Sequence, residues 1–204
     1  MNVILTDITE DPITKIAQAA GTSTNRVFNF SKRTPKERVE ECYKKGHMNV
    51  FEFVDATFYV TDISRVTTHQ LVRHRLASDV ERSHRYTTVE CANPDYCIIP
   101  ESIAQRADIC AMFVQQLRGA AGLYQIMLQE GIKPEDARYI LPEGTKTGIT
   151  VKTNLREYWH IFDMRTDIHA QWEIREMASR MIEALKNVSD DWKWLMELYT
   201  GSPK

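Results

Sequence analysis

The sequence predicts an α+β fold, in which helices pack on a small, mostly antiparallel sheet. Short stretches at residues 1–8, 57–63 and 145–153 have a strand-like alternation of side chains. Helical periodicity covers most of the remaining chain, and the strands are not spaced as in regular βαβ units. With 204 residues, 43% of them hydrophobic, the chain can bury a real core, so we expect a single domain over residues 1–204.

The N-terminal half is expected to contain three helices. Two short ones are predicted at residues 12–19 and 35–45. The second has clear end signals, because Thr34 can serve as its N-cap and Gly46 as its terminator. The third, over residues 64–75, follows the second strand and is expected to carry arginines at its C-terminal end.

The C-terminal half is dominated by helical patterns. Apolar residues recur at intervals of three and four from residue 102 to 130, which predicts one long central amphipathic helix closed by Gly131. A short helix should begin at Pro134. After the strand at 145–153, we expect helices at about 155–164, 170–187 and 190–199.

The composition of the chain limits the classes of binding partner that we expect for it. The formal net charge is −2, whereas general nucleic-acid binding usually needs a broad basic face. No apolar run approaches the length of a membrane span. The first residues lack the basic region of a secretory signal. The four cysteines show neither C-x-x-C spacing nor a disulfide-rich pattern. We therefore expect a reduced, cytoplasmic protein that binds neither nucleic acid nor membrane.

One basic segment, "RHRLASDVERSHRY" at residues 73–86, contains four arginines and two histidines. A solvated charged surface is the simplest interpretation, but a local cluster in a mildly acidic chain also suits a small anion. If residues 79–85 are extended, Glu81, Ser83 and Arg85 share one face, and Arg82 and His84 face the other way. That first face offers a carboxylate, a hydroxyl and a guanidinium, which suit a nucleotide.

Other chemistries have weaker support. No metal site is expected, because His69 and His74 are five residues apart, a poor spacing for one helical face, and no H-E-x-x-H motif is present. Ser83 lacks the surroundings of a nucleophilic serine. The chain has no P-loop and no G-x-G-x-x-G motif, so any nucleotide must be held by side chains and turns.

Several motifs together resemble those of the flavin-dependent thymidylate synthases. The family signature R-H-R-x7-S matches Arg73 to Ser83. Around it stand "GH" at 46–47, "FE" at 51–52, "ISR" at 63–65, "HQLVRHRLAS" at 69–78 and "E-x-S-x-R-Y" at 81–86. Downstream, in the family's order, follow "ARYILP" at 137–142, "TNLRE" at 153–157 and "MRTDIHAQWEIR" at 164–175. The resemblance covers about 46–86 and 134–175 well.

The resemblance implies a single catalytic domain with a definite reaction. Members methylate dUMP to dTMP with 5,10-methylenetetrahydrofolate as the carbon donor, FAD as the hydride carrier and NADPH as the reductant. They are homotetramers whose active sites are shared between subunits. Two alternatives stay open: a non-catalytic nucleotide-binding module, and a metal-dependent nucleotide phosphohydrolase.

The resemblance also implies the site residues. The expected contacts of FAD are His47, Asn49, Arg73, His74, Arg75, Glu81, Asn154, Arg156 and His160. The expected contacts of dUMP are Gln70, Arg73, Glu81, Ser83, His84, Arg85, Arg138 and Arg165. Arg165 matches the catalytic arginine, whose fixed charge could stabilise negative charge on the pyrimidine as N3 loses its proton.

Two further observations bear on the resemblance. None of the cysteines lies in a basic motif, so activation of the pyrimidine by a thiolate is not expected. The chain also departs from common family residues at Asn49, Phe53 and Val80. These departures concern local flavin and folate contacts and leave the expected reaction class unchanged.

Overall fold

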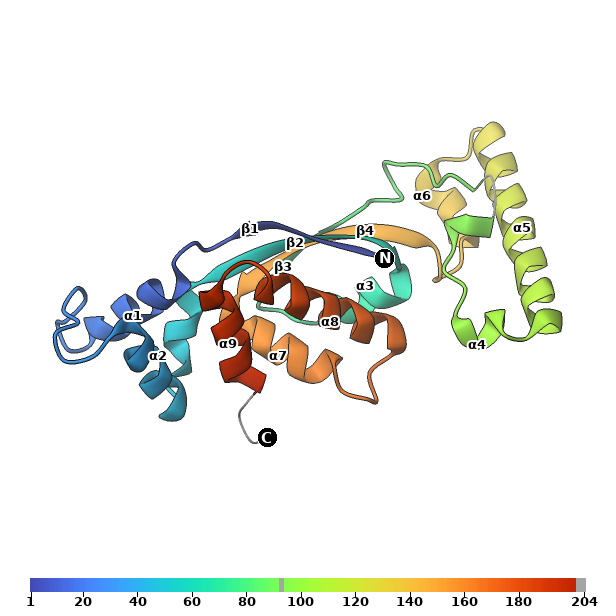
Figure 1. Ribbon diagram of the computed structural model, residues 1–204. Coiled ribbons are helices and arrows are strands. Elements are labelled where there is room, and N and C mark those ends of the chain that lie inside the picture. Colours follow the sequence, from blue (N-terminus) through green and yellow to red (C-terminus); the bar gives the residue numbers. More distant parts are fainter. Residues whose placement is uncertain (92–93, 201–204) are drawn as a thin grey trace. The chain divides into compact units, whose positions relative to one another are not determined.

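The computed structural model describes residues 1–91 and 94–200 and has the predicted α+β architecture (Figure 1). A four-stranded sheet has the order β1-β2-β4-β3. Its strands are β1 Asn2–Ile8, β2 Asp55–Ser64, β3 Ser78–Glu81 and β4 Lys146–Asn154. Neighbouring strands are antiparallel: Leu155 N donates to Val54 O at one end of the β2–β4 pair, and Arg65 N donates to Thr145 O at the other. The predicted sheet is thus confirmed, and β3 adds a strand.

The side chains of the central strands explain why this sheet forms. Ala56, Phe58 and Val60 of β2 are fully buried, and the residues between them are more exposed. This period of two is the strand pattern that the sequence predicts. In β4, Ile149 and Val151 are also buried. The core of the sheet is therefore built from β-branched and aromatic side chains.

The chain divides into two compact units. Unit 1 comprises residues 1–2, 60–71 and 80–149, and unit 2 comprises residues 3–59, 72–79 and 150 onward. Strands β2 and β4 contribute residues to both. The expectation of a single catalytic domain over residues 1–204 stays a prediction, and the two units are described separately below.

Unit 2 contains six helical elements among the described residues. In chain order they are α1 Pro12–Thr22, α2 Pro35–Lys44, the 3-10 helix η1 Met48–Phe53, α7 Leu155–Arg165, α8 Trp172–Lys186 and α9 Asp190–Thr200. Helix α2 begins with the expected N-cap, and Thr34 and Glu37 form a capping box. Helices α7, α8 and α9 pack in succession (Figure 1), with Ile174, Met177 and Met181 of α8 fully buried.

Unit 1 is built around a long helix. Its helical elements are α3 Arg65–Leu71, η2 Pro94–Tyr96, α4 Glu101–Ala104, α5 Ala107–Gln129, α6 Pro134–Ala137 and η3 Arg138–Ile140. Leu117 and Tyr124 of α5 form a small core with Tyr96 and Ala137. The hydroxyl of Tyr96 donates to Leu117 O at 2.8 Å, so this core includes a satisfied polar group.

Three sequence-based boundaries are wrong. The helix predicted at 102–130 is two helices, because Arg106 has an extended backbone conformation (φ −109°, ψ 93°). The helix predicted at 64–75 ends at Leu71, and beyond it His74 is buried between exposed neighbours, a pattern without helical period. The segment 79–85 is extended only to Glu81 and turns at residues 84–86, so the expected alternation stops there.

No helix within the described ranges has the length and apolar character needed to cross a membrane.

Candidate functional site

Helix α7 carries several of the predicted site residues in unit 2. It begins directly after β4, and Asn154 caps it by accepting a hydrogen bond from Glu157 N at 3.0 Å. The buried hydroxyl of Tyr158 donates to Ala56 O at 3.1 Å, which ties the helix to β2. Because the first turn and one face of α7 are held in this way, the positions of His160 and Arg165 are fixed by the fold.

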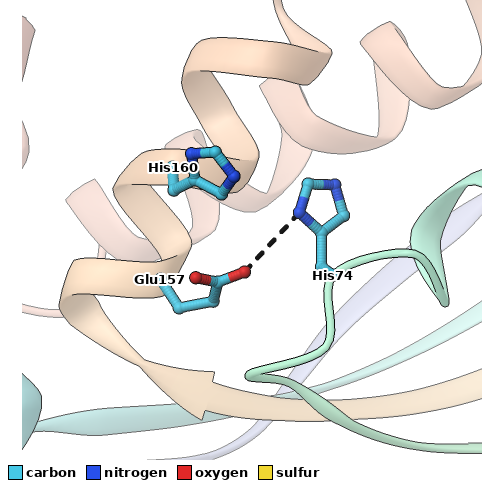
Figure 2. A group of neighbouring side chains, drawn as sticks. All are labelled: His74, Glu157 and His160. Atoms are coloured by element: carbon cyan, nitrogen blue, oxygen red, sulfur yellow. Dashed lines mark ion pairs between the residues drawn. The ribbon is translucent and has the colours of Figure 1, made fainter.

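Four side chains of unit 2 meet beside this helix, and Figure 2 shows three of them, His74, Glu157 and His160. His74 comes from the loop after α3, whereas Glu157, His160 and Arg165 come from α7. His74 Nδ1 lies 3.6 Å from a Glu157 carboxylate oxygen, and Arg165 Nε donates to His74 Nε2 at 3.0 Å. The rings of His74 and His160 are 5.7 Å apart, edge to face. We call these four residues the His74 cluster.

Burial sets the charge of the His74 cluster. His74 is only 5% exposed and Glu157 only 6%. Burial, with smaller contributions from Arg165 and His160, lowers the pKa of His74 to about 4. Burial also raises the pKa of Glu157. At neutral pH His74 is therefore a neutral imidazole beside a permanent guanidinium.

A cavity of about 590 Å³ opens next to the cluster, within unit 2. Its lining includes Asn154, Arg156, Glu157 and His160. Arg156 is held there by Glu52 of η1, with Nη1 2.6 Å from a carboxylate oxygen. Since Asn154 uses its carboxamide oxygen as a helix cap, its amide nitrogen is the donor that it can offer to a ligand.

The two arginines of the R-H-R motif differ from the histidine between them. Arg73 and Arg75 are exposed, whereas His74 is buried. The motif therefore presents two guanidinium groups to solvent and one imidazole to the interior. Exposed guanidinium groups are suited to bidentate contacts with phosphate.

The geometry also bears on metal binding. His74, Glu157 and His160 place possible ligand atoms within 4.8 Å of one another. His74 Nε2 already accepts from Arg165, and a guanidinium this close opposes a cation. That no metal is bound stays a prediction.

His47 and Asn49 lie around the start of η1. His47 lines a different cavity of unit 2, of about 740 Å³, between α1, α2 and the loop that joins them. Five cationic side chains and one carboxylate line this cavity: Arg26, Lys32, Arg33, Arg38, Lys45 and Glu41. Asn49 is exposed. Phe53, a departure from the family, is 65% exposed.

In unit 1, a second group of predicted residues surrounds Glu81. Its carboxylate accepts a hydrogen bond from Thr68 Oγ1 at 2.9 Å and lies 3.2 Å from Arg65 Nη1. Both partners belong to α3, so this helix fixes the end of β3. Val80, the other family departure in this strand, is 74% exposed.

His84 is buried among cations in unit 1. The side chain is 3% exposed, and its Nε2 has no hydrogen-bond partner among the described residues. Burial, followed by the nearby charges of Arg65, Arg82 and Arg138, lowers its pKa to about 4. An orphan ring nitrogen near three guanidinium groups is a site where an anion would be stabilised.

Three more predicted residues are joined through Glu135. Arg85 Nε lies 2.6 Å from the Glu135 carboxylate, and Arg138 Nε donates to Glu135 O at 3.2 Å. The hydroxyl of Ser83 accepts from Arg85 N at 3.2 Å, which closes the turn after β3. Gln70 donates its amide to Val66 O within α3.

The structure thus sorts most of the predicted residues into two groups, while His47 lines a separate cavity. His74, His160 and Arg165 meet in unit 2, with Asn154 and Arg156 at the adjoining cavity. The other group belongs to unit 1 and consists of Gln70, Glu81, Ser83, His84, Arg85 and Arg138. Sequence reasoning missed three charged residues: Arg65, Glu135 and Glu157. Arg65 ends the "ISR" motif and Glu157 ends "TNLRE", so these two lay in motifs that could have drawn attention to them, whereas Glu135 did not.

Known proteins resemble this chain in sequence and in fold. The family described as "Thymidylate synthase complementing protein" matches residues 4–189. A flavin-dependent thymidylate synthase of Pyrococcus furiosus is 35% identical over 197 residues, which cover 93% of this chain and 81% of that protein. One of Sulfurisphaera tokodaii is 37% identical over 196 residues, covering 92% and 74%.

Solved structures share the fold at lower identity. A Helicobacter pylori flavin-dependent thymidylate synthase, crystallised with FAD and dUMP, has a TM-score of 0.77 at 22% identity and covers 97% of this chain and 98% of that one. A UMP/dUMP methylase of Streptomyces cacaoi, bound with 5-Br dUMP, has a TM-score of 0.82 at 23% identity and covers 98% and 94%.

Proposed function

The chain belongs to the family of flavin-dependent thymidylate synthases, and from that premise we propose that it converts dUMP to dTMP by reductive methylation. In this proposal 5,10-methylenetetrahydrofolate donates the carbon, NADPH is the reductant and FAD is the bound cofactor. A non-catalytic module and a metal-dependent phosphohydrolase lose their support, because the relatives named above are synthases.

The observation that carries the proposal is the cluster of His74, Glu157, His160 and Arg165 beside a cavity with polar walls. The chemistry of these walls fits FAD. Arg73 and Arg75 offer two exposed guanidinium groups to a pyrophosphate, and Arg156 and Asn154 add donors inside the cavity. FAD, when bound, supplies the hydride. The protein's own part is to hold it and to shape the charge around the substrate.

Arg165 is the residue to which we assign the chemistry on the pyrimidine. Its Nε donates to His74, so a ligand would be met by the Nη groups. A guanidinium stays charged at all working pH values, and in a partly buried position it stabilises an adjacent anion more than it would in water. Arg165 would therefore favour the pyrimidine that has lost its N3 proton, which makes the carbon to be methylated more nucleophilic.

We assign the phosphate end of dUMP to the basic group of unit 1. Arg85 contacts the carboxylate of Glu135 and Arg138 its backbone oxygen, and the buried His84, whose Nε2 has no hydrogen-bond partner among the described residues, is near the charge of Arg138. Ser83 and Gln70 supply a hydroxyl and an amide. Glu81, which Thr68 and Arg65 hold in place, could accept from the sugar.

The proposal includes a homotetramer with shared active sites. One face of α5 supports self-association: Ile109, Met112, Leu123 and Ile126 are exposed at helical intervals, with Gly119 between them and open space around it. An apolar stripe of this kind marks an interaction surface, and a glycine lets a second helix approach closely. We also infer a cytoplasmic location, because the spacing of the four cysteines shows no disulfide-rich pattern.

The proposal is tested first by the visible absorbance of bound flavin and then by the formation of dTMP. The purified protein, supplemented with FAD, should show the visible flavin bands, and NADPH should bleach them under anaerobic conditions. Addition of dUMP and methylenetetrahydrofolate should then yield dTMP. A well-folded preparation that binds no FAD, or that binds it and forms no dTMP with all substrates present, would overturn the assignment.

A further inference from the structure

Arg165 and His74 make a hydrogen bond whose direction is fixed by chemistry. An arginine has only donors, so Arg165 Nε must donate and His74 Nε2 must accept across their 3.0 Å contact. The Nε2 atom therefore cannot carry a proton. Since burial keeps His74 neutral, its single ring proton has to be on Nδ1.

Nδ1 of His74 points to Glu157. A carboxylate oxygen lies 3.6 Å away, a separation at which the N–H dipole is attracted electrostatically although no direct hydrogen bond is formed. Figure 2 shows that Glu157 reaches toward His74 from α7. Glu157 thus stabilises the tautomer that Arg165 requires.

The stability of helix α7 does not by itself explain why a buried glutamate stands at position 157. Glu157 stands in the first turn of α7, where an exposed carboxylate would favour the helix dipole. The need for a cap is already met, because Asn154 accepts from Glu157 N. The carboxylate is instead nearly fully buried beside a histidine, which costs free energy through desolvation and calls for a local partner.

We propose that Glu157 is a positioning residue that acts through His74 on Arg165. It holds His74 in the Nδ1–H tautomer, so that Nε2 stays an acceptor and fixes the direction in which Arg165 presents its guanidinium. In the other tautomer two N–H groups would face each other at 3.0 Å, and Arg165 would have to turn away. The inference rests on the proposed role of Arg165 at the pyrimidine.

Kinetics of the FAD-loaded enzyme test the catalytic side. Glu157→Leu should lower kcat by about 10–100-fold, the range expected when a catalytic group is displaced by about 1 Å. The KM for dUMP and the flavin content should change no more than about twofold. Glu157→Gln keeps an acceptor oxygen without the charge, so its kcat should lie between those of the wild type and the Leu variant.

Glu173 provides a matched control. It is an equally buried acid on α8 of the same unit, 2% exposed, and its backbone N–H is capped by Gln171. Glu173→Gln should leave kcat per flavin-loaded subunit unchanged even if the protein becomes less stable. Equal losses of kcat in the two Gln variants would assign Glu157 a merely structural role and overturn the proposal.

A direct measurement of the tautomer does not depend on activity. In protein with ¹⁵N-labelled histidine, the His74 signals, assigned by their loss in His74→Gln, should indicate a protonated Nδ1 and a bare Nε2. Glu157→Gln should raise the Nε2–H population, because an amide can also donate to Nδ1. A wild-type protein with the proton on Nε2 would disprove the proposal even if the Leu variant fails to fold. An expected tautomer without dTMP formation would instead disprove the proposed function.

Discussion

A single buried histidine organises the unit 2 part of the site. The R-H-R motif predicts three ligand contacts in a row, but the structure separates them into two exposed guanidinium groups and one interior imidazole. His74 contacts Arg165, ninety-one residues further along the chain. Neither its burial nor its link with Glu157 could be predicted, because both depend on the contact between a loop and a helix. A glutamate in a first helical turn is normally read as a favourable surface charge.

At the residue scale, replacement of Arg165 should separate catalysis from cofactor binding. Arg165→Ala should lower kcat by about 10²–10³-fold, as is typical when one preorganised charge donor is lost, with FAD binding changed far less. Arg165→Lys should recover only part of the rate, because a point charge cannot reproduce a planar guanidinium. Steady-state kinetics and flavin titration measure the two effects. Near-normal dTMP formation by the Ala variant would exclude Arg165 from the mechanism.

The buried state of His84 predicts a pH dependence of stability. Its pKa in the folded protein is about 4, below the ordinary 6.5, so the unfolded chain binds the proton first as the pH falls. The stabilisation is complete above about pH 6.5 and is lost between about 6.5 and 4. Over that interval the wild type should lose roughly 3 kcal/mol relative to His84→Gln, as measured by urea unfolding.

The exposed His169 is the control for this effect. His169→Gln should follow the wild-type pH dependence throughout. If His84→Gln also follows it, the folded protein does not depress the pKa of His84.

At the scale of elements, the periodicity of the side chains predicted most strands and helices, but it did not predict where the backbone breaks or turns. The strands β1, β2 and β4 and the helices α7, α8 and α9 lie close to their predicted ranges. The break at Gln105 and Arg106 was missed, because the apolar spacing continues through it although the backbone of Arg106 is extended. The end of β3 was missed for a related reason: the alternation of residue types persists after Glu81, while the chain turns to bury His84.

The packing of α7 against the sheet depends on one buried hydroxyl. Tyr158 donates toward Ala56 O at 3.1 Å and Val151 O at 3.4 Å, from a side chain that is 1% exposed. Tyr158→Phe leaves these acceptors without that donor and should cost roughly 1–2 kcal/mol of unfolding free energy. Denaturant unfolding of the FAD-free protein measures this loss of unfolding free energy. Tyr199→Phe removes a more exposed hydroxyl bound to Asp163 and should cost clearly less. Equal costs would show that α7 is held by other contacts.

At the scale of the whole molecule, the distribution of the site residues bears on assembly. Arg165 belongs to unit 2 and Arg85 to unit 1, and the long helix α5 lies between the two motif blocks in sequence. The exposed apolar stripe of α5 is suited to contact with another subunit. The sequence predicted a shared site from the small size of the subunit and from the separation of the candidate ligands into blocks 47–85 and 138–165, and the family resemblance agreed. Only the resemblance predicted that the two arginines come from different subunits, since no periodicity reveals which copy of the chain supplies a given arginine.

The shared-site proposal predicts complementation between inactive variants. Arg85→Ala and Arg165→Ala homo-oligomers should each be nearly inactive, because every site lacks one guanidinium. If the two arginines of a site come from different subunits, co-refolded mixtures contain some sites with both intact arginines and others with neither. The mixture should then regain a substantial fraction of wild-type activity, measured as dTMP formed per flavin.

Native mass spectrometry, with one variant tagged, verifies that hetero-oligomers are present. A mixture of two differently tagged Arg165→Ala preparations is the control. Verified hetero-oligomers with no more activity than their parents would place both arginines of each site on the same chain.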